Sequence, residues 1–164
     1  MIVVSIIVIL SSILIGYSSQ SSKQLLLTST EAKLLSLISR AKFLSIETFF
    51  TEDDPEICAY GVTVDQAAGE IFIFQDRDPE CPADDRYNED DDLRLTGELN
   101  EITLDLNVMR IGDDTSLEDI VFIPPDPDVE INDGQTEASI VVELVDGSGD
   151  FTVTVNEAGQ VKAE

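Results

Sequence analysis

The chain contains no histidine and no tryptophan, only two cysteines, and few basic residues. Without histidine it lacks the side chain that most often acts as a general base or metal ligand near neutral pH. This absence excludes most hydrolase mechanisms and zinc sites. The 164 residues include 34 acids against 9 Lys and Arg, a net charge of −25. Because affinity for phosphates comes mostly from basic side chains, we expect no nucleic acid to bind the acidic part of the chain.

The acids are also missing from the start of the chain. Residues 1–22 carry no charged side chain, and residues 1–46 hold four bases and a single acid. The remaining 118 residues hold the other 33 acids and 5 bases, a charge of −28. A length typical of one domain therefore contains two unlike parts. We divide it into an apolar segment (1–22), a stem (23–50) and an acidic head (51–164).

The apolar segment opens with MIVVSIIVILSSILIGY (1–17), close to the roughly 20 residues that a membrane span needs. A cleaved signal peptide would begin with basic residues, but the first base is Lys23. A lipoprotein would have a cysteine directly after the run, but the first is Cys58. A cleaved signal peptide and a buried core helix remain as alternatives. We predict a single-pass membrane anchor that also serves in assembly, through Ile2, Val3, Val4, Ile6, Ile7, Val8, Ile9, Leu10, Ile13, Leu14 and Ile15.

Helical periodicity continues beyond the apolar segment. No proline occurs before Pro55, and apolar residues recur at spacings of three and four through the stem. The pattern predicts one helix from Ile2 to Thr48, roughly 70 Å long at 1.5 Å per residue. Its first half is apolar all round, and its second half presents one apolar stripe to the head. The residues of that stripe are Leu27, Leu34, Leu37, Ile38, Ala41 and Leu44.

Beyond Pro55 the apolar residues alternate with polar ones, which is typical of strands. In DFTVTV (150–155), for example, Phe151, Val153 and Val155 should face a core. We expect two short strands within 93–111, and further strands at 57–64, 70–74, 119–123, 138–145, 150–155 and 160–163. The predicted fold class is α+β, with a long N-terminal helix packed on a small antiparallel β-sandwich head.

The connection QDRDPECPADDRYNEDDD (75–92) is rich in acids. Clustered carboxylates are the ligands that Ca²⁺ prefers, so Asp76, Asp78, Asp84 and Asp85 are candidate calcium ligands. The alternative is a solvated acidic loop, which the prolines and the lack of glycine favour because they break the EF-hand spacing. Paired acids also occur in glycosidases, but the head has few aromatic residues to line a sugar cleft. We therefore expect no enzyme, no catalytic residue and no cofactor apart from that calcium.

Cys58 lies in an expected strand and Cys81 in the acidic connection. Zinc would need four ligands, and no histidine is available to complete the set. An even number of cysteines in a head outside a membrane predicts a disulfide between the two. Two unrelated thiols are the alternative.

Four stretches together resemble the type IV pilin family, and within it the H-type (FimT/GspH-like) minor pseudopilins. IVVSIIVILSSIL (2–14) is similar to the hydrophobic segment of pilins, and SSKQLLLTSTEAKLLSLISRAKFLSI (21–46) to their helical stem with its Arg-Ala pair. CAYGVTVDQAAGEIFIFQD (58–76) resembles a pair of head strands of that group. FTVTVNEAGQVKAE (151–164) resembles its closing hairpin.

The processing signature of this family does not occur in the chain. That signature is a short basic leader, a glycine, and a glutamate at the fifth position of the mature protein. The chain opens inside the apolar segment, and its first glutamate is Glu31. We expect that the gene start is placed too late by some tens of nucleotides. An unprocessed copy is the alternative.

The resemblance implies a non-enzymatic, minor subunit of a type IV pilus or type II secretion pseudopilus. Its partners would be other pilin-like subunits and, through the N-terminal helix, membrane lipid. It would sit as a single-pass protein of the inner membrane with an extracytoplasmic head, and at the cell surface after assembly. The alternative function is a monomeric, membrane-anchored acidic module that binds calcium or an adhesive ligand.

Overall fold

The computed structural model describes residues 2–51, 57–77, 81, 86–124, 128–132 and 134–164, and within the helix it describes the side chains of residues 21–48. A single helix, α1 (Ile2–Thr51), opens the chain and runs without interruption for 50 residues. This confirms the predicted continuous helix. Gly16 is the only glycine in the segment, and no proline interrupts the hydrogen-bond ladder.

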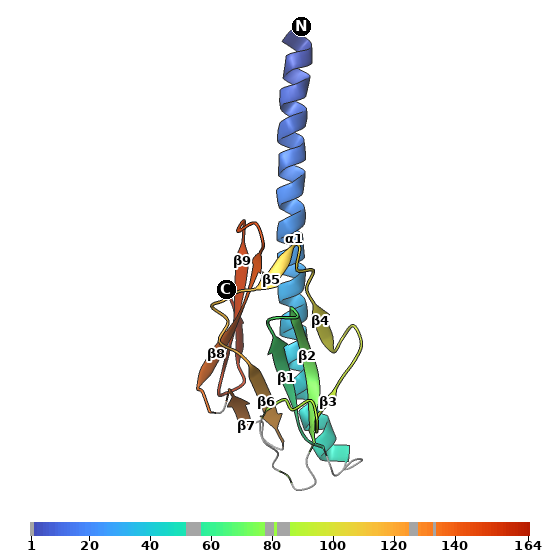
Figure 1. Ribbon diagram of the computed structural model, residues 1–164, viewed down its shortest axis with the longest axis vertical. Helices are drawn as coiled ribbons and strands as arrows, with labels where there is room; N and C mark the ends of the chain where they lie inside the picture. Colours follow the sequence, from blue (N-terminus) through green and yellow to red (C-terminus); the bar gives the residue numbers. More distant parts are fainter. Residues whose placement is uncertain (1, 52–56, 78–80, 82–85, 125–127, 133) are drawn as a thin grey trace.

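In the described part of the chain, ten strands follow the helix and form two antiparallel sheets (Figure 1). The larger sheet has the order β3-β2-β1-β6-β7, and β4 also pairs with β2. The smaller sheet has the order β10-β9-β8-β5. The strands of the larger sheet are β1 (Ile57–Asp65), β2 (Glu70–Arg77), β3 (Leu93–Arg94), β4 (Glu101–Thr103), β6 (Asp119–Ile123) and β7 (Asp128–Ile131). Those of the smaller sheet are β5 (Met109–Ile111), β8 (Glu137–Leu144), β9 (Asp150–Asn156) and β10 (Val161–Ala163).

Two details of the strand prediction are wrong. Residues 93–111 hold three short strands rather than two, because the chain pairs twice with the same edge of β2 and then crosses to the other sheet, where β5 pairs with β8. The sequence pattern also missed β7, whose residues DVEI alternate over only four positions, too few to mark a strand. Ile131 of β7 pairs with Ile120 of β6, and both are fully buried.

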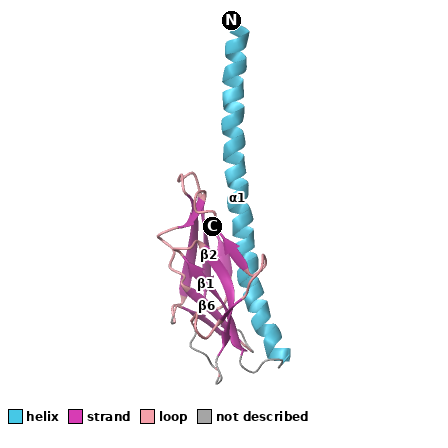
Figure 2. Cartoon of the chain, turned by 45° about the vertical axis from the view of Figure 1, so that its right-hand side comes forward, coloured by secondary structure: helices cyan, strands magenta, loops and turns pink. Residues whose placement is uncertain are grey.

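One hydrophobic core joins the stem to both sheets. Leu34, Leu37, Ile38 and Ala41 of α1 are at most 3% exposed and belong to the same buried cluster as apolar residues of both sheets. Figure 2 shows the C-terminal part of α1 lying along the head while its N-terminal part extends beyond it. The predicted α+β fold, with a long helix packed on an antiparallel β-rich head, is confirmed. As predicted, Phe151, Val153 and Val155 of β9 are buried.

Polar contacts hold both edges of the stem to the head. Arg40 donates from Nε to Asn100 Oδ1 at 2.8 Å on the side of the larger sheet. On the other side, Lys42 donates to the backbone oxygen of Gly159 at 3.5 Å. Between them the buried Ser45 hydroxyl donates to the backbone oxygen of Phe122. These hydrogen bonds therefore oppose both rotation of the stem about its axis and sliding of the stem along the head.

Gly61 occupies a crowded position in the larger sheet. It lies in the middle of β1 opposite Phe74 on β2 and Val121 on β6. A Cβ placed there would lie 2.3 Å from Phe74 Cζ and 2.8 Å from the backbone oxygen of Ile120. Because the second contact is with backbone, a side-chain rotation alone does not relieve it.

We predict that Gly61→Ala destabilises the protein by at least about 2 kcal/mol through overpacking. Gly112→Ala is the matched control, because its Cβ would lie 3.1 Å from the Val141 side chain and 3.6 Å from the Val141 backbone oxygen, and it should cost about 1 kcal/mol or less. Urea unfolding followed by circular dichroism measures both. Equal midpoints for the two variants would show that β1 and β2 can separate at no cost.

Candidate functional site

The N-terminal part of α1 extends beyond the head, and no strand lies beside it (Figures 1 and 2). The predicted assembly residues between Ile2 and Ile15 lie in this part of the helix, and their side chains lie outside the described residues. Among the residues whose side chains the structure describes, no helix is both long and apolar enough to span a membrane.

The outward face of the stem is uncharged over almost five turns. Leu25, Ser29, Ala32, Ser36 and Phe43 are spaced by four, three, four and seven residues, so they share one side of the helix. All five are exposed, and Leu25 and Phe43 are exposed by 69% and 62%. We call these five residues the outer stem face. It combines small side chains, which allow helices to approach closely, with a large apolar residue at each end.

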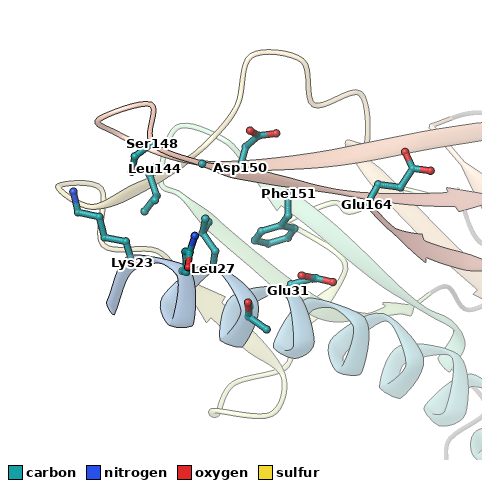
Figure 3. Close-up of a pocket in the computed structure, with 11 residues that line it drawn as sticks. Lys23, Leu27, Glu31, Leu144, Ser148, Asp150, Phe151 and Glu164 are labelled. Carbon is teal, nitrogen blue, oxygen red and sulfur yellow. The ribbon is translucent and has the colours of Figure 1, made fainter. Parts of the chain in front are cut away.

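A groove separates one edge of the stem from the β8–β9 hairpin (Figure 3). It encloses about 420 Å³. Leu27 of α1, Leu144 of β8 and Phe151 of β9 supply its apolar side chains, and Figure 3 shows them between the helix and the hairpin. Glu31 on the helix and Asp150 on the hairpin are also part of its lining. We call this the hairpin groove.

Gly149 sets how closely the hairpin approaches the helix. A Cβ at this position would lie 3.1 Å from Leu27 Cδ1. At the same end of the groove Lys23 forms an ion pair with Asp146. The hydrogen bond from Lys23, followed by those from Ser148, lowers the pKa of the Asp146 carboxyl. Lys23 and Asp146 therefore neutralise each other at the mouth of the groove.

A second hollow, of about 490 Å³, lies on the opposite edge of the stem beside β4. Lys33 of the helix lines it together with Glu98, Leu99 and Glu101. Glu101 accepts a hydrogen bond from Arg94 at 3.0 Å, which together with the Gly97 backbone N–H lowers the pKa of Glu101. Leu99 is 69% exposed. We call Lys33 and Leu99 the cationic ridge.

The structure describes only one of the four predicted calcium ligands. Asp76 is on β2 and is 1% exposed, whereas Asp78, Asp84 and Asp85 lie outside the described residues. Within the described part of the chain, no group of three or more His, Cys, Asp or Glu side chains is arranged to hold a metal ion. Calcium binding stays a prediction.

Beyond that segment, the end of the acidic connection is organised by its own carboxylates. Asp92 accepts hydrogen bonds from the backbone N–H of Asn88 at 2.7 Å and from that of Arg77 on β2 at 3.1 Å. The Asn88 side chain donates to Asp91 at 2.8 Å. Hydrogen bonds to backbone N–H groups stabilise ionised carboxylates, so these acids contribute to the local fold.

Cys58 and Cys81 form a disulfide, which confirms the predicted pairing. It joins β1 to the acidic connection across 23 residues of sequence. Closing a loop of this length contributes about 3 kcal/mol of stability in the chain-entropy model. The described residues contain no free cysteine.

Asp119, at the start of β6, is a partly buried acid that no sequence pattern singles out. Burial raises the pKa of its carboxyl, and hydrogen bonds from the Thr63 side chain and the Tyr87 backbone lower it in part. One carboxyl oxygen is buried without a hydrogen-bond partner among the described residues. The net effect is a raised pKa, so the protonated form of the acid is more favoured in the folded state than in the unfolded state.

Sequence reasoning also missed the hairpin groove and the cationic ridge. Each combines helix residues with head residues that are more than sixty positions away, so no local spacing marks them. The available signal was compositional, because Lys33 is one of only four bases in the first 46 residues. The exposed Leu99 follows Glu98 and carried no pattern of its own.

Comparison with known proteins returned one solved structure and no sequence relative. No family model matches the chain, and no curated protein sequence matches it. The solved structure is that of the minor pseudopilin EpsH from the type 2 secretion system of Vibrio cholerae. It is 13% identical, the match covers 86% of this chain and 94% of EpsH, and the TM-score is 0.46. EpsH is the kind of protein that the sequence resembles.

We predict that Asp119→Asn stabilises the protein at neutral pH and leaves its stability at low pH almost unchanged. An acid with a raised pKa in the folded state binds more protons there than in the unfolded state, so its contribution to stability falls as pH rises above about 3.8. Urea unfolding of wild type and variant between pH 4 and 7 measures the difference. A difference that does not grow with pH would contradict the assignment.

Proposed function

We propose that this protein is a non-enzymatic subunit of a pilus-like filament, of the type IV pilus or type II secretion kind, and that it assembles through α1. The observation that carries this proposal is the continuous helix with a projecting N-terminal part and an uncharged outer stem face. A helix that served only the core of the head would end where the head ends. This one continues and presents apolar and small side chains to a partner.

The chemistry of residues 2–15 suits two successive environments. The segment is uncharged and rich in Ile, Val and Leu, so it is compatible with lipid before assembly and with other apolar helices afterwards. Large aliphatic side chains gain little on exchanging lipid for protein, so close helix packing must come from small residues. Ser11, Ser12 and Gly16 supply them. Single-pass anchoring in the inner membrane is part of this proposal.

The disulfide supports an extracytoplasmic head. Disulfides persist in oxidising compartments and are rare in the cytosol. The head carries a large net negative charge, so two heads repel each other, and association must begin at surfaces where charge is absent or complementary. The outer stem face is such a surface. It would place the stems of neighbouring subunits in contact and leave the heads outside.

The proposal predicts that Ala32→Glu abolishes assembly without unfolding the head. The new carboxylate would lie in the middle of the outer stem face, where burial against a neighbouring helix leaves it without a partner. Ala158→Glu is the matched control, because it makes the same substitution at an exposed position in the β9–β10 turn. The full chain is expressed in a bacterial inner membrane, and assembly is measured by chemical cross-linking and sedimentation.

We expect Ala32→Glu to lose the cross-linked ladder while Ala158→Glu keeps it. The thermal unfolding midpoint of Ala32→Glu should be unchanged. Equal ladders in wild type and both variants would show that the outer stem face is not buried. A wild-type chain that stays monomeric in the membrane would favour the alternative function, a monomeric acidic binding module.

The predicted calcium site is tested separately, with the full chain in detergent. Plain screening of the acidic head should raise the unfolding midpoint equally in NaCl, MgCl₂ and CaCl₂ of matched ionic strength, and we expect this result. Specific binding would instead stabilise the folded state by about 2.7 kcal/mol at a hundredfold excess over Kd. A calcium-specific shift that Asp84→Ala removes would contradict our expectation and establish Asp76, Asp78, Asp84 and Asp85 as a metal site.

A further inference from the structure

The hairpin groove holds negative charge that this chain does not neutralise. Its lining includes Lys23, which is paired with Asp146, and Glu164, which is paired with Lys162. Glu31 and Asp150 are the remaining charged residues of the lining, and neither forms an ion pair among the described residues. Two carboxylates beside an apolar floor suit a ligand with an aliphatic stem and a cationic end, as a lysine side chain has.

In the part of the chain that the structure describes, one basic side chain forms neither an ion pair nor a hydrogen bond. Lys23, Arg94, Arg110 and Lys162 form ion pairs. Arg40 and Lys42 donate hydrogen bonds to the head, and Arg77 and Arg86 also have interactions. Lys33 is exposed and has neither an ion pair nor a hydrogen bond among the described residues, although Glu98 lines the same hollow. It stands beside the exposed Leu99, so the ridge is both cationic and apolar.

The ridge and the groove lie on opposite edges of the stem. The helix residues of the groove are Gln24, Leu27, Thr28 and Glu31. Lys33 follows their mean position by between five and six residues, which is about half a turn beyond one full turn of an α-helix. The same offset corresponds to about 8 Å along the axis. The ridge of one copy can therefore face the groove of a parallel neighbour that is displaced by about that distance.

We propose that copies of this chain associate side by side in one repeating sense, with Lys33 and Leu99 of one copy seated in the hairpin groove of the next. Lys33 would pair with Glu31 and Asp150, and Leu99 would extend the apolar floor of Leu27, Leu144 and Phe151. This contact deepens the proposed filament function and rests on it. Because the two surfaces differ, the contact leaves a free ridge at one end of the assembly and a free groove at the other, as a growing filament requires.

Cysteine cross-linking tests the contact in the full chain, assembled in the membrane. Thr28→Cys places a thiol in the groove and Thr103→Cys places one beside the ridge, and both positions are exposed. The native cysteines do not compete, because they are bonded to each other. Two differently tagged chains, each with one new cysteine, are coexpressed and oxidised. We expect the mixed dimer to exceed either self-linked dimer by at least about fivefold, because ridge meets groove in a heterologous contact.

Charge reversal separates this contact from general association. Lys33→Glu on the Thr103→Cys chain should lower the yield of mixed dimer by about tenfold, and Glu31→Lys on the Thr28→Cys chain should restore it. Arg110→Glu makes the same change of charge at an exposed residue away from both surfaces and should leave the yield unaltered.

The failures of the two proposals can be told apart. Equal yields of mixed and self-linked dimers, or an equal loss with Arg110→Glu, would overturn the ridge-and-groove contact. If sedimentation still shows wild-type assembly in that case, the filament function stands and the subunits meet elsewhere. If the wild-type chain does not assemble at all, both proposals fail.

Discussion

The burial of one stem face against two sheets at once is the interaction on which the rest of the structure depends. Leu34, Leu37, Ile38 and Ala41 complete a core that neither sheet encloses alone. A helix held in this way behaves as part of the head from about Lys23 onward. Its N-terminal part must then follow the direction that the core sets, because no glycine or proline between Ile2 and Thr51 other than Gly16 offers a hinge. The core of the head therefore sets the orientation of the N-terminal segment, which is proposed to enter the membrane and the filament.

In this acidic head, several carboxylates form ion pairs or accept hydrogen bonds from nearby residues, and these contacts favour folding. Glu70 and Glu101 share Arg94, which also lies 4.1 Å above the Phe72 ring, and Asp92 accepts two backbone N–H groups. Such pairs at the surface are each worth about 1 kcal/mol or less. They matter here because they offset the negative charge of these carboxylates, so the remaining repulsion comes from the other acids. Acids that form no ion pair within the described part of the chain, such as Glu31 and Asp150, then mark positions where a cation from outside would gain most.

Local patterns predicted the parts of this protein that depend on neighbouring residues in sequence. The absence of proline and the three-and-four spacing of leucines predicted α1, and the alternation of Phe151, Val153 and Val155 predicted the buried face of β9. The double pairing along the edge of β2 could not be predicted, because β3 and β4 are two and three residues long and gain their order from β2 itself. The groove and the ridge were missed for a related reason: each exists only after the stem has docked.

The stem thus separates three tasks around one helix. Its inward face supplies the core, and its outward face is uncharged. Its two edges carry charges of opposite sign that form no ion pair among the described residues, Glu31 on one edge and Lys33 on the other. Uncharged faces bring helices together without choosing among rotations or axial offsets, since small side chains pack in many registers. Charges of opposite sign on the two edges penalise most of those arrangements, because a shift of a few residues brings Lys33 away from carboxylates or leaves acids facing acids. Adhesion between subunits would then come from the face and register from the edges. This division explains how so acidic a protein can associate in one defined way.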